Sequence, residues 1–144
     1  MIGTGGLVGR VTNVVGNAST VTLITDEEFA APARTTRGGV AGTIRPETGT
    51  PGDLIFEFAD KTEEVEEGDR VATSAGGSIR FPSYFPSGIP IGKVSRIEDG
   101  AGELDREIHV RPAADISNLR YVTVLTSVPR DALTAAAGTG GGAP

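Results

Sequence analysis

The chain has a single histidine, so any chemistry that needs an imidazole base must use His109. A serine-hydrolase triad in the chain order His, Asp, Ser would combine it with Asp115 and Ser117. These three residues lie too close in sequence to converge from separate elements, as the members of a triad usually do. Because His109 stands between Ile108 and Val110, the alternation of a β-strand predicts that its side chain faces solvent. The sequence therefore predicts no catalytic residue and no enzyme.

Metal and cofactor sites have equally little support. The chain has no cysteine, which excludes a thiolate zinc site, a disulfide framework and a cysteine nucleophile. Residues 99–105 carry three acids without the fixed ligand pattern of an EF-hand, so a turn is the better interpretation. The sequence contains no Walker motif, and no glycine-rich dinucleotide fingerprint stands ahead of a helix. We expect no cofactor and no bound metal.

The clearest binding chemistry lies in residues 81–94, a run rich in aromatic residues and proline. It holds three of the seven aromatic residues in the chain and three of the nine prolines. A loop stiffened by proline loses little entropy on ordering and displays aromatic anchors well. The candidate partner-binding residues are therefore Phe81, Tyr84, Phe85 and Ile89. Alternatively, Phe81 and Phe85 fold inward and plug the open end of a barrel. Stability and binding measurements on Phe81→Ala and Tyr84→Ala would distinguish the two interpretations.

The elements that position these residues are predicted to be β-strands. The chain holds 13 Val, 10 Ile and 16 Thr against 7 Leu, and β-branched side chains fit pleated sheets better than helices. Its 21 Gly and 9 Pro supply turns. Apolar runs at short spacing predict about nine strands, which is typical of a barrel or a sandwich.

Five of these strands are predicted in the first half of the chain and four in the second. The first two form a hairpin around a four-residue turn, Gly16 to Ser19. The third contains Pro32, which should confine it to a sheet edge. The predicted strands cover residues 7–15, 21–25, 29–34, 40–44, 54–58, 70–73, 92–98, 106–111 and 121–126.

The charge of the chain excludes some partners. A net charge of −6 with scattered basic residues argues against nucleic acid, because phosphate contacts need clustered Lys and Arg. An acidic surface also repels anionic lipid head groups. No run approaches the ~18 consecutive apolar residues of a transmembrane helix, and no signal peptide is visible. We expect any membrane anchor to lie outside this chain.

Several short motifs occur in one order along residues 7–126 and together resemble the C-terminal β region of the rod shape-determining protein MreC family. The most specific are Pro-Ser-Gly-Ile-Pro-Ile-Gly at 86–92 and Pro-Ala-Ala-Asp at 112–115. The others are the hairpin at 9–26, Ala-Pro-Ala-Arg at 31–34, Gly-Thr-Ile at 42–44 and Glu-Gly-Asp-Arg-Val-Ala-Thr-Ser at 67–74. The chain differs from the family pattern at residues 78–84, where extra residues precede Phe85.

The resemblance implies an all-β fold of two small β-barrels packed together, distantly trypsin-like in architecture. We accordingly expect a first barrel over residues 1–60 and a second over residues 61–127, with a last strand that can return to the first. Residues 128–144, mostly Ala, Gly and Thr, are expected to form a flexible tail.

The resemblance also implies a function. Members of the family act as non-catalytic scaffolds of the bacterial cell-wall elongation complex and maintain rod shape. The implied partners are a class B penicillin-binding protein, MreD and other elongation-complex proteins, and further copies of the same chain. The implied location is extracytoplasmic, on the periplasmic side of the cell membrane, with an N-terminal transmembrane helix that this chain does not include.

Two other interpretations stay open. A cryptic or inactive trypsin-like hydrolase predicts that the His109 imidazole lies within hydrogen-bond reach of a serine hydroxyl in a cleft. A generic β-barrel adaptor of an envelope assembly is suggested by the turn and strand at residues 67–71.

Overall fold

A computed structural model describes residues 1–3, 5–50, 52–58, 64–74, 85–99 and 106–126 of the chain. Within these residues the secondary structure is almost entirely β, with a single 3-10 turn, η1, at Ile116–Asn118. None of the described helical segments has the length and apolar character needed to cross a bilayer. The all-β prediction is confirmed.

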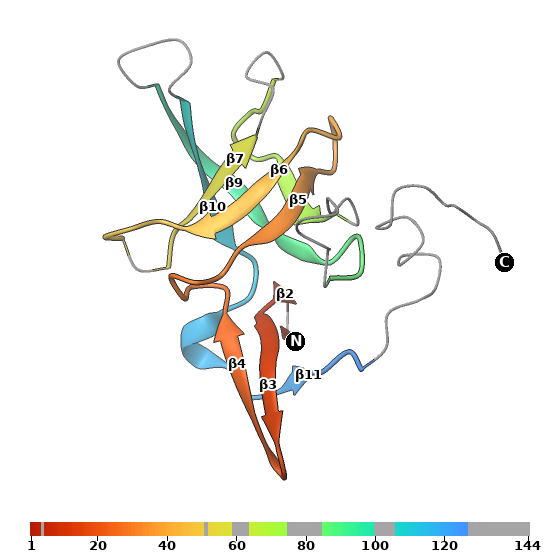
Figure 1. Ribbon diagram of the computed structural model, residues 1–144. Coiled ribbons are helices and arrows are strands. Elements are labelled where there is room, and N and C mark those ends of the chain that lie inside the picture. Colours follow the sequence, from red (N-terminus) through yellow and green to blue (C-terminus); the bar gives the residue numbers. More distant parts are fainter. Residues whose placement is uncertain (4, 51, 59–63, 75–84, 100–105, 127–144) are drawn as a thin grey trace, which may run out of the picture.

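Six strands close into an antiparallel barrel in the order β10-β7-β6-β5-β8-β9 (Figure 1). Closure depends on β10, which pairs with β9 on one side and with β7 on the other. The six strands are β5 at Ala31–Thr35, β6 at Ala41–Pro46, β7 at Leu54–Phe58, β8 at Arg70–Thr73, β9 at Pro90–Asp99 and β10 at Arg106–Pro112.

The barrel closes because alternate residues of its strands are apolar and share one interior. On β10, Ile108 and Val110 are fully buried, and they lie beside Phe56 and Leu54 of β7 in the ladder. Side chains on the other strands complete the same core, and alternation along a strand sends every second side chain inward. These include Ala31, Ala33, Ile44, Val71, Ile91 and Val94.

The remaining five strands form two small sheets beside the barrel. Strands β1 at Ile2–Gly3, β2 at Gly6–Leu7 and β11 at Val122–Thr123 make one sheet in the order β11-β1-β2. The other sheet is the hairpin of β3 at Gly9–Val15 and β4 at Ala18–Leu23, which projects away from the barrel in Figure 1. Leu7 and Ile24 belong to the same buried cluster as the barrel interior, so the parts share one core.

The closed barrel draws strands from both halves of the chain. The expected boundary at residue 60 lies inside it, because β5 to β7 precede that residue and β8 to β10 follow it. In the described part of the chain, the other five strands form the two small sheets rather than a second closed barrel. The last strand, β11, does return to the beginning of the chain, where it pairs with β1. The expected tail at residues 128–144 lies outside the described residues.

The opening hairpin is confirmed, but its turn is shorter than the sequence suggested. Val15 pairs with Ala18, which leaves only Gly16 and Asn17 in the turn. Gly16 has a φ of 57°, whereas no other type of residue in the described chain has a positive φ. Glycine at the first central position is typical of a type II′ turn, whose twist matches that of the flanking strands.

The prediction that Pro32 confines its strand to an edge is wrong. Strand β5 pairs with β6 on one side and with β8 on the other. The carbonyl oxygen of Pro32 accepts a hydrogen bond from Ser74 N at 3.0 Å, one residue beyond the end of β8. Since the N and C=O of one residue point to the same side of a strand, the missing N–H of Pro32 faces Ser74, one residue beyond the β5–β8 ladder, which begins with the pair Ala33 and Thr73.

We predict that Gly92→Ala destabilises the barrel. A Cβ at this position of β9 would collide with the backbone carbonyl oxygen of Arg111 on β10, so the two strands would have to separate. Forcing a methyl group into such a contact costs about 1–3 kcal/mol of unfolding free energy, measurable by urea unfolding. The control is Gly38→Ala, whose Cβ would lie 3.6 Å from both Thr35 Oγ1 and Val40 Cγ2. An equal loss for both variants would contradict the close approach of β9 to β10.

Candidate protein-binding surface

A turn at residues 86–89 precedes β9, and Thr73 at the end of β8 holds it. The buried Thr73 hydroxyl donates to Pro86 O at 2.5 Å and accepts from Ile89 N at 2.9 Å. Two backbone bonds, Thr73 N to Ile89 O at 2.9 Å and Gly88 N to Thr73 O at 2.8 Å, complete the connection. Gly88 has a φ of 88°, a conformation that glycine adopts without strain. The sequence motifs at residues 67–74 and 86–92 are therefore in contact through Thr73.

Phe85, which precedes this turn, points inward. Its side chain is 6% exposed, and its ring lies 5.8 Å from the ring of Phe29 at an interplanar angle of 60°. A tilted pair at this distance is a favourable aromatic contact. Phe85 is thus oriented as expected if it plugs the end of the barrel, and not as an exposed contact residue. Phe81 and Tyr84 lie outside the described residues, so for them both alternatives remain predictions.

A groove of about 450 Å³ lies beside Phe85, between the barrel and the small sheets. Ile89, the fourth predicted partner-binding residue, is half-buried there and packs against the core. The groove also brings together the start of β3 and the residues after β11, which are distant in sequence. Its apolar lining includes Leu7, Val11, Phe85, Ile89, Val124 and Leu125.

An exposed apolar strip continues from this groove along residues 119–125. Tyr121 is 87% exposed, and the other large apolar side chains of the strip range from 37% to 46%. They are Leu119, Val122, Val124 and Leu125. Contiguous exposed apolar side chains on a protein surface mark sites of association. We call this set together with the groove the apolar strip.

The hairpin tip is a second exposed apolar site, where Val14 is 68% and Val15 is 67% exposed. Sequence reasoning did not select either the strip or the tip for binding, because it treated both as ordinary strands. The available signal was that the predicted last strand, residues 121–126, alternates poorly and has no charged residue. Only burial distinguishes such a segment from a core strand.

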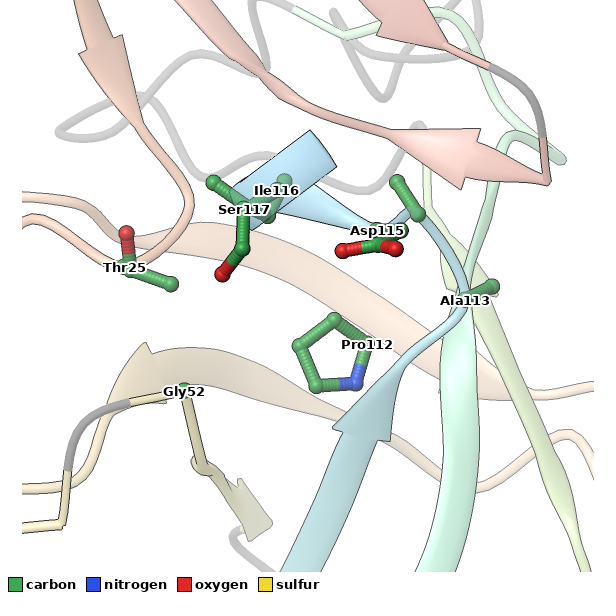
Figure 2. Close-up of a pocket in the computed structure, with 8 residues that line it drawn as sticks. Thr25, Gly52, Pro112, Ala113, Asp115, Ile116 and Ser117 are labelled. Atoms are coloured by element: carbon green, nitrogen blue, oxygen red, sulfur yellow. The ribbon is translucent and has the colours of Figure 1, made fainter. Parts of the chain in front are cut away.

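A second hollow, of about 580 Å³, lies at the end of β10 and is lined by the Pro-Ala-Ala-Asp motif at residues 112–115. Figure 2 shows the side chains of Thr25, Asp115 and Ser117 around it. Asp115 accepts a hydrogen bond from Asn118 Nδ2 at 3.0 Å, so its partner in the described structure is an amide and not an imidazole. His109 is not among the lining residues of this hollow.

The prediction that His109 faces solvent is wrong. Its side chain does point away from the barrel interior, but it is fully buried, since Glu47 and Asp53 from the β6–β7 connection lie against it. Its Nδ1 lies 2.9 Å from Asp53 Oδ2. The nearby Ser95 hydroxyl donates to the main-chain oxygen of His109 at 3.3 Å and not to the ring. Among the described residues, the serine–imidazole contact that a cryptic hydrolase requires is not formed.

The sequence matches the family described as "Rod shape-determining protein MreC, barrel core" over residues 1–126. A similar protein is the cell shape-determining protein MreC of Cereibacter sphaeroides, which is 34% identical over 122 residues. That match covers 85% of this chain and 36% of the relative. The chain thus spans about a third of the length of the curated relatives it matches.

The fold is also that of solved MreC structures. The crystal structure of MreC from Pseudomonas aeruginosa superimposes with a TM-score of 0.69 at 27% identity, covering 83% of this chain and 74% of the other. MreC from Helicobacter pylori, solved in a complex with the penicillin-binding protein PBP2, superimposes with a TM-score of 0.57 at 22% identity. That match covers 76% of this chain and 63% of the other, and it shows a shared fold.

We predict that Phe85→Ala lowers the free energy of unfolding by about 3–5 kcal/mol, the usual cost of emptying a buried phenylalanine site. Calorimetric unfolding would show a fall in Tm of several degrees or more. The matched control is Tyr121→Ala, which removes a ring that is 87% exposed and should change stability by less than about 0.5 kcal/mol. If the two variants were equally stable, Phe85 would not be part of the core.

Proposed function

Since the chain belongs to the MreC family of rod shape-determining proteins, we propose that it is a non-catalytic scaffold of the bacterial cell-wall elongation complex. Its task there is to hold a class B penicillin-binding protein in the complex and so to maintain rod shape. Membership of this family favours the scaffold over the generic envelope adaptor. The absence of a serine–imidazole contact within the described residues supports a binding role over a hydrolytic one.

A solved complex of a protein with a similar fold supports the proposed partner. The H. pylori MreC that was solved with PBP2 shares the arrangement of strands found here. Because this chain covers only about a third of its curated relatives, the partners of the whole proteins are extended to it as part of the proposal.

The observation that carries the proposal is the apolar strip. The exposed Tyr121 belongs to a segment of exposed aliphatic side chains whose last two, Val124 and Leu125, line the groove, and aromatic and aliphatic residues of this kind are typical of an interface core. Tyrosine is a frequent hot-spot residue because its large, rigid ring buries much area at a small entropic cost. Although the net charge of the protein is −6, the strip carries no acidic residue and can form an apolar contact with a partner.

Self-association is a second part of the same proposal. Among the described strands, β4 pairs only with β3, and β11 pairs only with β1. Each therefore presents an open edge that can add a strand from another copy. The exposed Val14 and Val15 at the hairpin tip would add apolar area to such a contact.

The proposed location is extracytoplasmic. The fold resembles that of structures described as the major periplasmic domain of the cell shape-determining filament MreC, at 26% identity and a TM-score of 0.60. In the full-length protein, an N-terminal helix would anchor the domain to the membrane, where MreD and other elongation proteins would be within reach.

We predict that Tyr121→Ala and Leu125→Asp each weaken binding to the transpeptidase domain of the cognate class B penicillin-binding protein by about tenfold or more. Truncating a hot-spot anchor, or burying a charge in its place, costs about 2 kcal/mol or more of binding free energy, and tenfold corresponds to about 1.4 kcal/mol. Isothermal titration calorimetry of the 144-residue chain would measure the change.

The control is Thr48→Asp, which adds the same charge at an exposed position of the β6–β7 connection and should bind like the unchanged chain. Both interface variants must keep the unfolding temperature of the parent. A folded partner that does not bind the chain at all would overturn the scaffold proposal, whereas equal weakening by all three variants would only exclude the strip as the contact.

A further inference from the structure

The fully buried imidazole of His109 stands at the centre of a group of carboxylates on the outer face of the barrel. On β10, Ile108 and Val110 point inward, so His109 points outward. The connection between β6 and β7 covers it, and the backbone bond from Glu47 N to Asp53 O at 3.0 Å closes that connection. The imidazole of His109 is thus buried outside the hydrophobic core, beneath Glu47 and Asp53 of the β6–β7 connection.

One side of the ring is occupied by a hydrogen bond. His109 Nδ1 lies 2.9 Å from Asp53 Oδ2, and a carboxylate can only accept, so Nδ1 carries the proton of this bond. Arg96 Nη2 lies 3.4 Å from the same nitrogen, at the long limit for a hydrogen bond. In the neutral ring, the lone pair is therefore on Nε2.

The other side of the ring has no hydrogen bond within the described residues. His109 Nε2 is buried and unpartnered, and it faces Glu98 Oε2 at 3.6 Å and Glu107 Oε2 at 3.7 Å. The two glutamates are direct cross-strand partners in the β9–β10 ladder, on the outer face. Like charges in such positions repel each other, so this arrangement favours a cation between them.

Arg96 is a cation of the same cluster, since its Nη2 also lies 3.7 Å from Asp53 Oδ2, whereas Arg45 pairs with Glu57 outside it. Arg96 Nε pairs with Glu98 Oε1 at 3.1 Å, which leaves Oε2 of that glutamate directed at the ring. Arg45 Nη2 pairs with Glu57 at 2.6 Å, and the hydrogen bond that Arg45 donates to Glu57 is the main cause that raises the pKa of its guanidinium. Among the described residues, Glu107 has no arginine or lysine within ion-pair distance, although its charge also raises the pKa of the Arg45 guanidinium from further away.

We propose that Glu98, Glu107 and His109 Nε2 bind a divalent transition-metal cation, with Zn²⁺ as its representative. Their ligand atoms all lie within 4.8 Å of one another. Tetrahedral zinc with bonds of about 2.0–2.2 Å separates its ligands by about 3.4 Å, close to the 3.6 and 3.7 Å found here. One imidazole with two carboxylates suits zinc better than Mg²⁺ or Ca²⁺, which prefer oxygen alone.

Asp53 acts as the positioning residue of this site. A metal-binding histidine usually donates its second ring N–H to a carboxylate, which fixes the tautomer and the orientation of the ring. The other possible triad, Glu47, Asp53 and the same histidine, would require a metal in place of the 2.9 Å hydrogen bond at Nδ1. A cation at Nε2 keeps that bond and fills the side that lacks one, and it would link β9 to β10.

The test is a titration of the tag-free chain, cleared of metal with a chelator, with ZnCl₂ alone. We expect saturable binding by calorimetry at one equivalent and a rise in Tm of several degrees, because a ligand that binds only the folded state stabilises it. MgCl₂ at the same ionic strength should produce neither effect. No zinc-dependent change, or an equal rise in Tm with Mg²⁺, would overturn the proposal.

Matched variants locate the site. Glu107→Gln removes one ligand charge at an exposed position and should weaken Zn²⁺ binding at least about tenfold while the chain stays folded. Glu57→Gln removes a glutamate of similar exposure, 53% against 61%, on the neighbouring strand β7 and should bind Zn²⁺ like the parent. Unchanged binding by Glu107→Gln would assign the zinc to other residues and refute the site. Neither result bears on the scaffold function, which is tested separately.

Discussion

Barrel closure requires β10 to pair with β7 on one side and with β9 on the other, and the remaining features of the chain follow from this constraint. It makes residues 54–58 neighbours of residues 106–112, although some fifty positions separate them along the chain. A closed sheet has a single interior, so each strand must send its apolar side chains to the same side. Ile44, Phe56 and Ile108 meet there. The hydrophobic effect drives this burial, and the ladder hydrogen bonds fix its register.

Closure also decides which polar residues meet outside the barrel. The residues of β9 and β10 that point outward stand in two adjacent rows, and the connection between β6 and β7 folds over them. Four carboxylates thereby surround one imidazole, and Arg96 pairs with two of them, Asp53 and Glu98; the proposed metal ion would balance part of the remaining negative charge. The open strand edges lie instead on the small sheets, and the apolar strip lies on and beside them, so the two kinds of chemistry are carried by different parts of the fold.

Strands with a compact apolar run between turn residues were predictable in detail. The predicted strands at residues 54–58 and 70–73 have the bounds of β7 and β8. The errors arose where a distant segment changes the meaning of a local pattern. Pro32 stands in a strand paired on both sides, because β8 ends before the missing N–H would be needed. His109 alternates as expected, yet residues more than fifty positions earlier bury it.

By itself, the sequence determined that this chain is a β protein of the MreC family without cysteine chemistry, because composition, turn residues and short motifs are local properties. It also supplied the aromatic and proline-rich run, but not the direction in which Phe85 points. Three features depend on the folded barrel: Phe85 packs on Phe29, the large apolar side chains of residues 119–125 stay exposed, and Glu98, Glu107 and His109 lie close together. These outcomes depend on which strands pair, and pairing is set by the free energy of the whole closed sheet rather than by any single segment.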